Sequence, residues 1–176
     1  MAVLVEANSV IVRVQAINDH HAGGWAAFDE SVPNNTLCSD NDVARVGFMN
    51  PNDCEPFVAG LQGRGLVFLR DGRCQDIAIA IQGAGLSFPC DWLEYGPVEI
   101  EPTRFVAAVW RKGAANSPVA CPVDWQYEKS LSRQSVIVPP EQMDRSLKFL
   151  RHQDGIDVHL NLQTGQEVYI GRPKQP

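Results

Sequence analysis

The sequence lacks a long apolar run, a Cys-x-x-Cys pair and a complete nucleotide-binding glycine motif. Its longest uncharged stretch, residues 77–90, contains glycines and a proline and is too short to span a bilayer. The N-terminus has no basic region before its apolar residues and meets Glu6 at once, which is unlike a signal peptide. These absences argue against a membrane protein and favour a cytoplasmic one.

The five cysteines are few, widely spread and odd in number, which is unlike a small disulfide scaffold or a zinc site. We therefore expect reduced thiols. Cys54 falls on a predicted helical core stripe and Cys74 opens an apolar strand, so both are expected to be small buried hydrophobes. The sequence predicts no cofactor.

The formal charge of −6 is distributed unevenly. Residues 1–103 carry 5 Lys or Arg and 14 Asp or Glu, whereas residues 104–176 carry 10 and 7. The acidic half would repel nucleic acid and favour a basic protein partner, and attraction between the halves would assist docking within the chain or in a homodimer. The alternative is that both are ordinary solvated faces.

The length of 176 residues, with 44% hydrophobic and 20% charged residues, is typical of one globular domain or two small ones. In the N-terminal part, β-branched residues predict strands over 10–17 and 43–48, with a short helix near 25–28. Asn50 as N-cap and Pro51 at the first helical position predict a second helix. Its apolar face combines Cys54, Phe57, Val58 and Leu61.

A hairpin is expected to follow this helix, because Asp71-Gly72 suits a tight turn between apolar strands at 66–69 and 77–81. Farther along, residues 83–103 are loop-like at both ends and residues 105–110 predict a strand.

The C-terminal part repeats the plan, with a strand over 135–138, a helix after Pro140 and a hairpin joining 156–162 to 167–170. Aligning the two prolines, Pro51 and Pro140, places the core positions of both helices in register at Met143, Leu147 and Leu150. This is a candidate internal repeat, with chance as its competitor. We predict an α+β fold with mixed, mainly antiparallel sheets, built from two βαββ-like units of residues 1–100 and 101–176 that pack as one domain.

Candidate catalytic residues are weakly indicated. Cys90 beside Asp91 would act as a nucleophile if His20 or His21 approached as a base. The alternative is that Trp92 anchors a loop in the core while Asp91 caps a turn. Adjacent histidines point in different directions in a helix or a strand, so the pair predicts no metal site. Candidate binding residues are Trp25, Trp92, Glu94 and Tyr95.

Three functional hypotheses follow. The first, favoured slightly, is a protein-interaction or regulatory module, such as an acidic inhibitor-like or immunity-like partner of a basic protein; it leans away from an enzyme. The second is a small-molecule-binding protein or cysteine-dependent enzyme with a pocket between the two halves. The third is a structural homo-oligomer joined through sheet edges.

Overall fold

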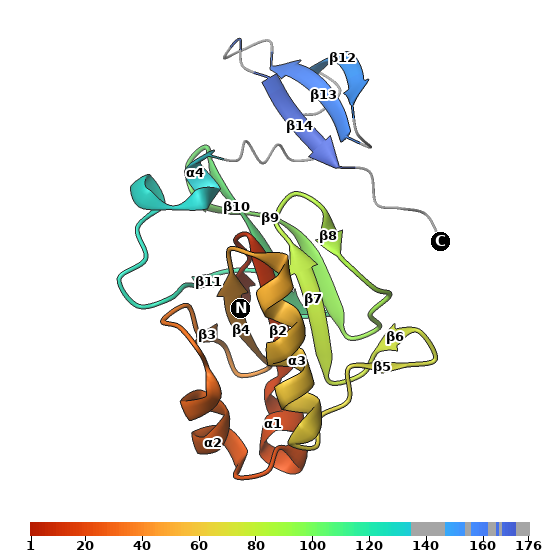
Figure 1. The fold of residues 1–176 in the computed structure, drawn as a ribbon. Helices are drawn as coiled ribbons and strands as arrows, with labels where there is room; N and C mark the ends of the chain where they lie inside the picture. The colour runs from red at the N-terminus through yellow and green to blue at the C-terminus, as the bar shows by residue number, and fades with distance from the viewer. Residues whose placement is uncertain (135–146, 154–155, 162–164, 166, 172–176) are drawn as a thin grey trace.

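The computed structural model describes residues 1–134, 147–153, 156–161, 165 and 167–171 (Figure 1). Its helices and mainly antiparallel sheets confirm the predicted α+β class. Within the described ranges, no helix is both long and apolar enough to cross a membrane.

Two sheets form the body of the protein. The first has five antiparallel strands in the order β3 (Cys38–Ser39), β4 (Val43–Phe48), β2 (Asn8–Arg13), β7 (Ile77–Ile81) and β8 (Gly85–Leu86). The second has four strands in the order β11 (Val119–Ala120), β1 (Ala2–Leu4), β10 (Arg104–Arg111) and β9 (Leu93–Glu101). In this second sheet the pair of β1 and β11 is parallel and the other pairs are antiparallel.

The five-stranded sheet is buried on both faces. Along β2, Val10 and Val12 pack with the helices, whereas Ile11 between them packs with β1 and β10 of the second sheet. The helices are α1 (Val14–His20), α2 (Gly24–Ser31) and α3 (Cys54–Gly63), and Figure 1 shows α3 lying across the strands. Burial of each valine or isoleucine side chain stabilises the fold by about 1.5–3 kcal/mol. Because both faces of β2 are buried, its residues 10–12 are all apolar and do not alternate with polar ones.

The predicted start and face of α3 are confirmed. The Oδ1 of Asn50 accepts a hydrogen bond from the Asn52 N–H at 2.9 Å, and a 3-10 turn over Pro51–Asp53 leads into the helix. The side chains of Cys54, Val58 and Leu61 are buried. The N-cap and the apolar spacing therefore act together, as the sequence indicates.

The predicted turn at Asp71-Gly72 is present, with φ of 52° and 74°. It joins two short strands, β5 (Leu69–Arg70) and β6 (Arg73–Cys74), and not the longer pair that the sequence suggested. The expected second strand, β7, instead pairs with β2 in the five-stranded sheet.

Two predictions in the N-terminal unit were wrong. Residues 14–17 belong to α1 and not to a strand, with Ala16 and Ile17 buried in the helical core. Alternation over so few residues does not distinguish the two structures. Strand β9 was not predicted, because residues 83–103 were described only as loop-like at both ends; β9 contains Pro97 and is the edge strand of its sheet, where proline is tolerated.

The helix predicted after Pro140 is wrong where it can be tested. Residues Leu147–Gln153 form β12, which pairs with β13 (Ile156–Asn161), and β13 pairs with β14 (Glu167–Gly171) as the predicted hairpin. The register shifts between Phe149 and Arg151, and such a bulge breaks the alternation that would have indicated a strand.

The internal repeat is therefore not confirmed, because Leu147 and Leu150 lie in a strand while Val58 and Leu61 lie in a helix. The strand predicted over 135–138 and the beginning of the second helix lie outside the described residues. The predicted division near residue 100 falls in the hairpin of β9 and β10, so the two units share the four-stranded sheet.

Candidate functional site

The candidate residues between 90 and 95 lie in and just before β9, beside the β5–β6 hairpin. The backbone N–H of Cys74 donates to the carbonyl of Pro89 at 2.9 Å, which brings Cys90 alongside Cys74. The indole Nε1 of Trp92 donates to the carbonyl of Cys74 at 3.3 Å. Two chain segments are thereby joined at two points around the thiols.

Cys90 is half-buried and Cys74 is buried. The Cys74 Sγ lies 3.9 Å from the carbonyl oxygen of Phe88, and the groups beside the Cys90 sulfur that can donate to its thiolate are the Cys74 thiol and the backbone N–H groups of Trp92 and Leu93. These donors hold the pKa of Cys90 below its ordinary value. The neighbouring Cys90 thiolate, together with burial, raises the pKa of Cys74.

Asp91 forms an exposed ion pair with Arg73. The Nε of Arg73 donates to the Oδ2 of Asp91 at 2.9 Å, and a second N–H of the guanidinium reaches Oδ1. This pairing lowers the pKa of the carboxyl, so Asp91 is a poor general base near neutral pH. Exposed pairs contribute little to stability, so we interpret this one as holding the loop in place.

A polar cleft of about 510 Å³ opens beside Trp92. The guanidinium carbon of Arg13 lies 5.7 Å from the centroid of the Trp92 ring, in a cation–π arrangement. Across the cleft, Nη1 of Arg111 pairs with Oδ1 of Asp42 at 3.2 Å. The remaining charged lining residues are Asp91 and Lys112.

This cleft combines both predicted halves, since Arg13 and Asp42 come from the first and Arg111 and Lys112 from the second. Trp92 and Asp91 were candidates from the sequence, but the basic residues were not. Their positions at strand ends of two different sheets carry no local sequence signal.

Glu94 and Tyr95 have structural contacts. The Oε2 of Glu94 accepts from Nε1 of Trp110 at 2.6 Å, and the hydroxyl of Tyr95 accepts from the Gly83 N–H at 3.0 Å. Burial raises the pKa of Tyr95. The Glu94 bond is a cross-strand contact within the second sheet, and the Tyr95 bond ties β9 to the turn before β8.

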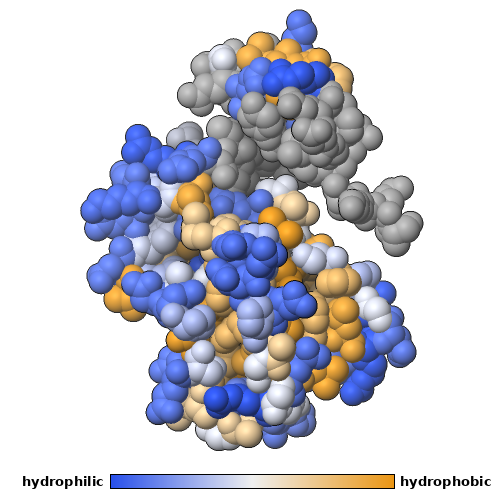
Figure 2. Space-filling model, in the orientation of Figure 1, coloured by the Kyte–Doolittle hydropathy of each residue, from blue (hydrophilic) through white to orange (hydrophobic). Residues whose placement is uncertain are grey.

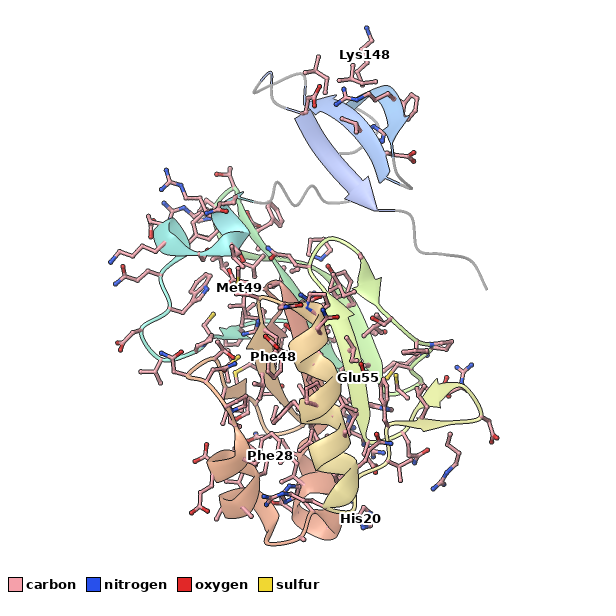
Figure 3. All side chains as sticks on the ribbon, in the orientation of Figure 1. His20, Phe28, Phe48, Met49, Glu55 and Lys148 are labelled. Carbon is pink, nitrogen blue, oxygen red and sulfur yellow. The ribbon has the colours of Figure 1, made fainter. Side chains whose placement is uncertain are left out.

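The two histidines lie at the end of α1, and His20 is exposed there (Figure 3). His21 is buried against Phe28, with ring centroids 6.0 Å apart. Burial lowers the pKa of His21, and neither ring nitrogen meets a described partner in hydrogen-bond geometry. Neither histidine is among the described groups that chiefly raise or lower the pKa of Cys90. The structure therefore gives no support to a catalytic pair of the Cys90 thiol and an imidazole base.

Trp25 is half-buried and packs on Phe28 within the helical layer, with ring centroids 5.5 Å apart. That layer carries a groove of about 630 Å³ that α2 and α3 border. Its apolar lining consists of Pro33, Phe48, Pro56, Phe57 and Leu61.

Asp53 is the carboxylate in the lining of this groove, and other carboxylates are exposed elsewhere on the same helices. Asp29 and Glu30 are exposed on α2, and Asp53 and Glu55 are exposed at the beginning of α3. Arg64, at the far end of α3, is the basic residue in the lining. Figure 2 shows this face with hydrophobic atoms lying among hydrophilic ones, and Figure 3 labels Glu55 and Phe48 on opposite sides of α3.

Within the described part of the chain, no three His, Cys, Asp or Glu side chains are grouped so as to hold a metal ion. Comparison with protein-family models, with curated proteins and with solved structures gives no match.

Proposed function

We propose that this protein is an interaction module that binds a basic, amphipathic segment of a partner protein in the groove between α2 and α3. The observation that carries the proposal is an apolar groove of about 630 Å³ with Asp53 in its lining, bordered by two helices whose other exposed charges include Asp29, Glu30 and Glu55. Apolar grooves of this kind accept the apolar face of a helix, and charges at the rim select the partner and guide its approach.

The apolar floor of the groove supplies the anchor. Phe48 and Phe57 lie with ring centroids 5.4 Å apart, and Phe57 is half-buried, so a partner side chain can bury aromatic area here. Met49, directly after Phe48, is 75% exposed and lies outside the lining of the groove. Aromatic residues and methionine are enriched in the centres of interfaces, where burial gives most of the affinity.

The rim supplies selectivity. The lining itself has one carboxylate, Asp53, and one guanidinium, Arg64, whereas α2 and the beginning of α3 together carry four exposed carboxylates, so the two helices are acidic overall. A segment with lysine or arginine beside its apolar residues matches this pattern. An acidic segment of equal hydrophobicity does not, since like charges across an interface are costly.

The test uses a fluorescein-labelled synthetic helical peptide of leucine and lysine, with a second peptide that has glutamate in place of lysine. Fluorescence anisotropy with the full chain should show binding of the lysine peptide alone, and that binding should weaken as ionic strength rises. Equal binding of both peptides, or binding indifferent to salt, would contradict the acidic rim.

Two glycines of α3 provide matched variants. Gly60 lines the groove and Gly63 does not, and at both positions an added Cβ meets nothing within 4 Å. Gly60→Arg should fill the groove with a cation and weaken the lysine peptide at least about tenfold, whereas Gly63→Arg should leave its affinity within about threefold. Equal effects of the two variants would place the binding surface elsewhere.

A second candidate function is the binding of a small anionic ligand in the cleft beside Trp92. The favouring observation is the convergence of Arg13, Arg111 and Lys112 with an aromatic ring in one cleft of about 510 Å³. Calorimetric titration with AMP, and with inorganic phosphate as the non-aromatic comparator, tests it. Saturable heat that Lys112→Gln reduces supports the cleft, and no heat with either probe rejects it.

The third hypothesis, association through sheet edges, stays a prediction. The outer strands of the five-stranded sheet, β3 and β8, have two residues each, and the longer edge strand β9 contains Pro97. Short edges and edge prolines both oppose pairing with another chain. Equilibrium sedimentation of the whole protein at micromolar concentration decides this point, because a monomer excludes the oligomer.

A further inference from the structure

Cys74 and Cys90 are the two thiols that the fold brings together at the edge of the body. Cys74 ends β6 and Cys90 precedes β9, and the 2.9 Å bond from Cys74 N–H to Pro89 carbonyl fixes the two backbones side by side. The Cys74 sulfur also lies 3.9 Å from the carbonyl oxygen of Phe88. Both side chains belong to the same apolar cluster, and both thiols are free.

The two thiols differ in access. Cys90 is half-exposed beside the polar cleft that Asp91 and Trp92 line, whereas only 6% of the Cys74 surface is exposed. A reagent therefore meets Cys90 first. Cys74 lies behind it in the same apolar cluster, with its N–H bonded to the carbonyl of Pro89.

The two thiols also differ in pKa, and again Cys90 is the one favoured for reaction. The N–H groups of Trp92 and Leu93, together with the Cys74 thiol, stabilise the Cys90 thiolate and lower the pKa of Cys90. Cys74 stays protonated while Cys90 is ionised, because its proton is shared with that thiolate and burial disfavours a second charge. An exposed thiolate backed by a protonated thiol is the arrangement of an attacking and a resolving cysteine.

The geometry points to a reversible redox site in which Cys74 and Cys90 close an intramolecular disulfide at the expense of a low-molecular-weight disulfide. This redox site is separate from the groove between α2 and α3, and the proposal does not depend on binding in that groove.

The reaction takes two steps. The Cys90 thiolate attacks one sulfur of the small disulfide, so that a mixed disulfide forms and one small thiolate leaves. Cys74 then loses its proton to solvent and attacks the Cys90 sulfur, which forms the Cys74–Cys90 bond and releases the second small thiolate. The protein dithiol is oxidised by two electrons, and the small disulfide is reduced to two thiols.

The remaining cysteines lack this combination. Cys38 and Cys54 are buried, and the pKa of each is raised by burial. Cys121 is half-buried like Cys90, but burial raises its pKa to about 12. Cys121 is therefore the matched control, because its side chain is exposed to a similar degree but its pKa is not lowered.

The test treats the reduced full chain with oxidised glutathione, quenches with acid and N-ethylmaleimide, and analyses intact and digested protein by mass spectrometry. The expected product has lost two hydrogen atoms, carries no glutathione and yields a linked peptide containing Cys74 and Cys90. Excess dithiothreitol should restore the starting mass. Stable glutathionylation of wild-type Cys90, without the linked peptide, would overturn the proposal.

Single variants separate the two roles. Cys74→Ser should stop at glutathione bound to Cys90, and Cys90→Ser should leave Cys74 unmodified, while Cys121→Ser should behave as wild type. With wild-type protein alone, brief alkylation near neutral pH should label Cys90 at least about tenfold faster than Cys121. Equal labelling rates overturn the proposal even if a variant fails to fold.

Discussion

Two clusters of arginine with cysteine, one inside the molecule and one at its edge, behave in opposite ways. Arg45 is only 3% exposed and lies beside Cys38, between the two large sheets. Arg73 is exposed and lies near Cys74 and Cys90. Burial raises the pKa of Cys38 to about 11 despite the neighbouring guanidinium. The pKa of Cys90 is lowered instead.

The difference shows that the balance between loss of hydration and donors to the thiolate, and not the presence of an arginine, sets the pKa of each thiol. At the inner cluster, loss of hydration penalises the thiolate more than Arg45 stabilises it. At the edge, backbone N–H groups and a second thiol replace the lost water around Cys90. The inner cluster is therefore structural, whereas the outer one has the requirements for chemistry.

Arg45 satisfies its buried charge through oxygen acceptors. Its Nε donates to the Ser9 hydroxyl at 2.9 Å, and its Nη2 donates to the Glu6 carbonyl at 2.8 Å. A longer bond of 3.4 Å runs from Nη1 to the carbonyl of Thr36. Burial lowers the pKa of Arg45, so each of these acceptors helps to keep the guanidinium charged.

The largest expected effect comes from removing this inner cation. Arg45→Met keeps much of the side-chain volume but leaves the Ser9, Glu6 and Thr36 acceptors without their donor, so we expect a loss of about 3–5 kcal/mol in the free energy of unfolding. Urea unfolding followed by circular dichroism measures it. Arg70→Met, at an exposed position of β5, is the control and should change stability by less than about 0.5 kcal/mol. Equal values for the two variants would show that the inner cluster has no structural role.

A second substitution disturbs the same cluster by crowding. A Cβ added at Gly47 would lie close to the Arg45 guanidinium, 2.7 Å from its Cζ, so Gly47→Ala must displace a buried charge. We expect a loss of about 2 kcal/mol. Gly60→Ala on α3 meets open space and should instead stabilise the helix by about 0.5–1 kcal/mol. The two alanine variants should shift the urea midpoint in opposite directions, and a shared direction would refute the packing argument.

The sequence predicted the local structures whose signals are themselves local. Asn50 and Pro51 mark the beginning of α3, and Asp71-Gly72 marks a turn, because each acts on the residues beside it. Strand β9 was not predicted, and its Pro97 is tolerated because β9 is the edge strand of its sheet. Short alternating stretches, as at residues 14–17, were not decisive.

The sites were less predictable than the elements. Cys90 was identified, but its partner Cys74 was expected to be only a small core residue, since their contact depends on the path of the β5–β6 hairpin. Arg45 and Glu6 were not identified at all. The Glu6 carboxylate accepts from the Ser132 N–H at 2.9 Å and from its hydroxyl at 2.6 Å, across most of the chain. Without homologous sequences, such a distant pairing has no signal in one chain.

The raised pKa of Cys38 predicts a smaller effect, confined to alkaline pH. Unfolded Cys38 ionises near 9.0, whereas the folded thiol stays protonated to about 11. The protonated Cys38 thiol stabilises the folded state fully below the pKa of the unfolded chain, and this stabilisation is lost as pH rises towards the pKa of the folded protein. The loss of unfolding free energy amounts to about 1 kcal/mol near pH 10. Cys38→Ala should flatten the decline in unfolding free energy between pH 8 and 10 relative to wild type, with Ser39→Ala as the control. If the unfolding free energy of Cys38→Ala declines with pH as steeply as that of wild type, the pKa of Cys38 is not raised in the folded protein.

The smallest effect is expected from the outer arginine. Arg73→Gln removes an exposed ion pair with Asp91, so the free energy of unfolding should not change measurably. The alkylation rate of Cys90 should fall by less than about threefold, because the N–H groups of Trp92 and Leu93 and the Cys74 thiol remain in place. Cys74→Ser should slow alkylation more than Arg73→Gln does, since it replaces the first of these donors. If Arg73→Gln slows Cys90 more than Cys74→Ser, the surface cation, and not the buried thiol, controls the outer cluster.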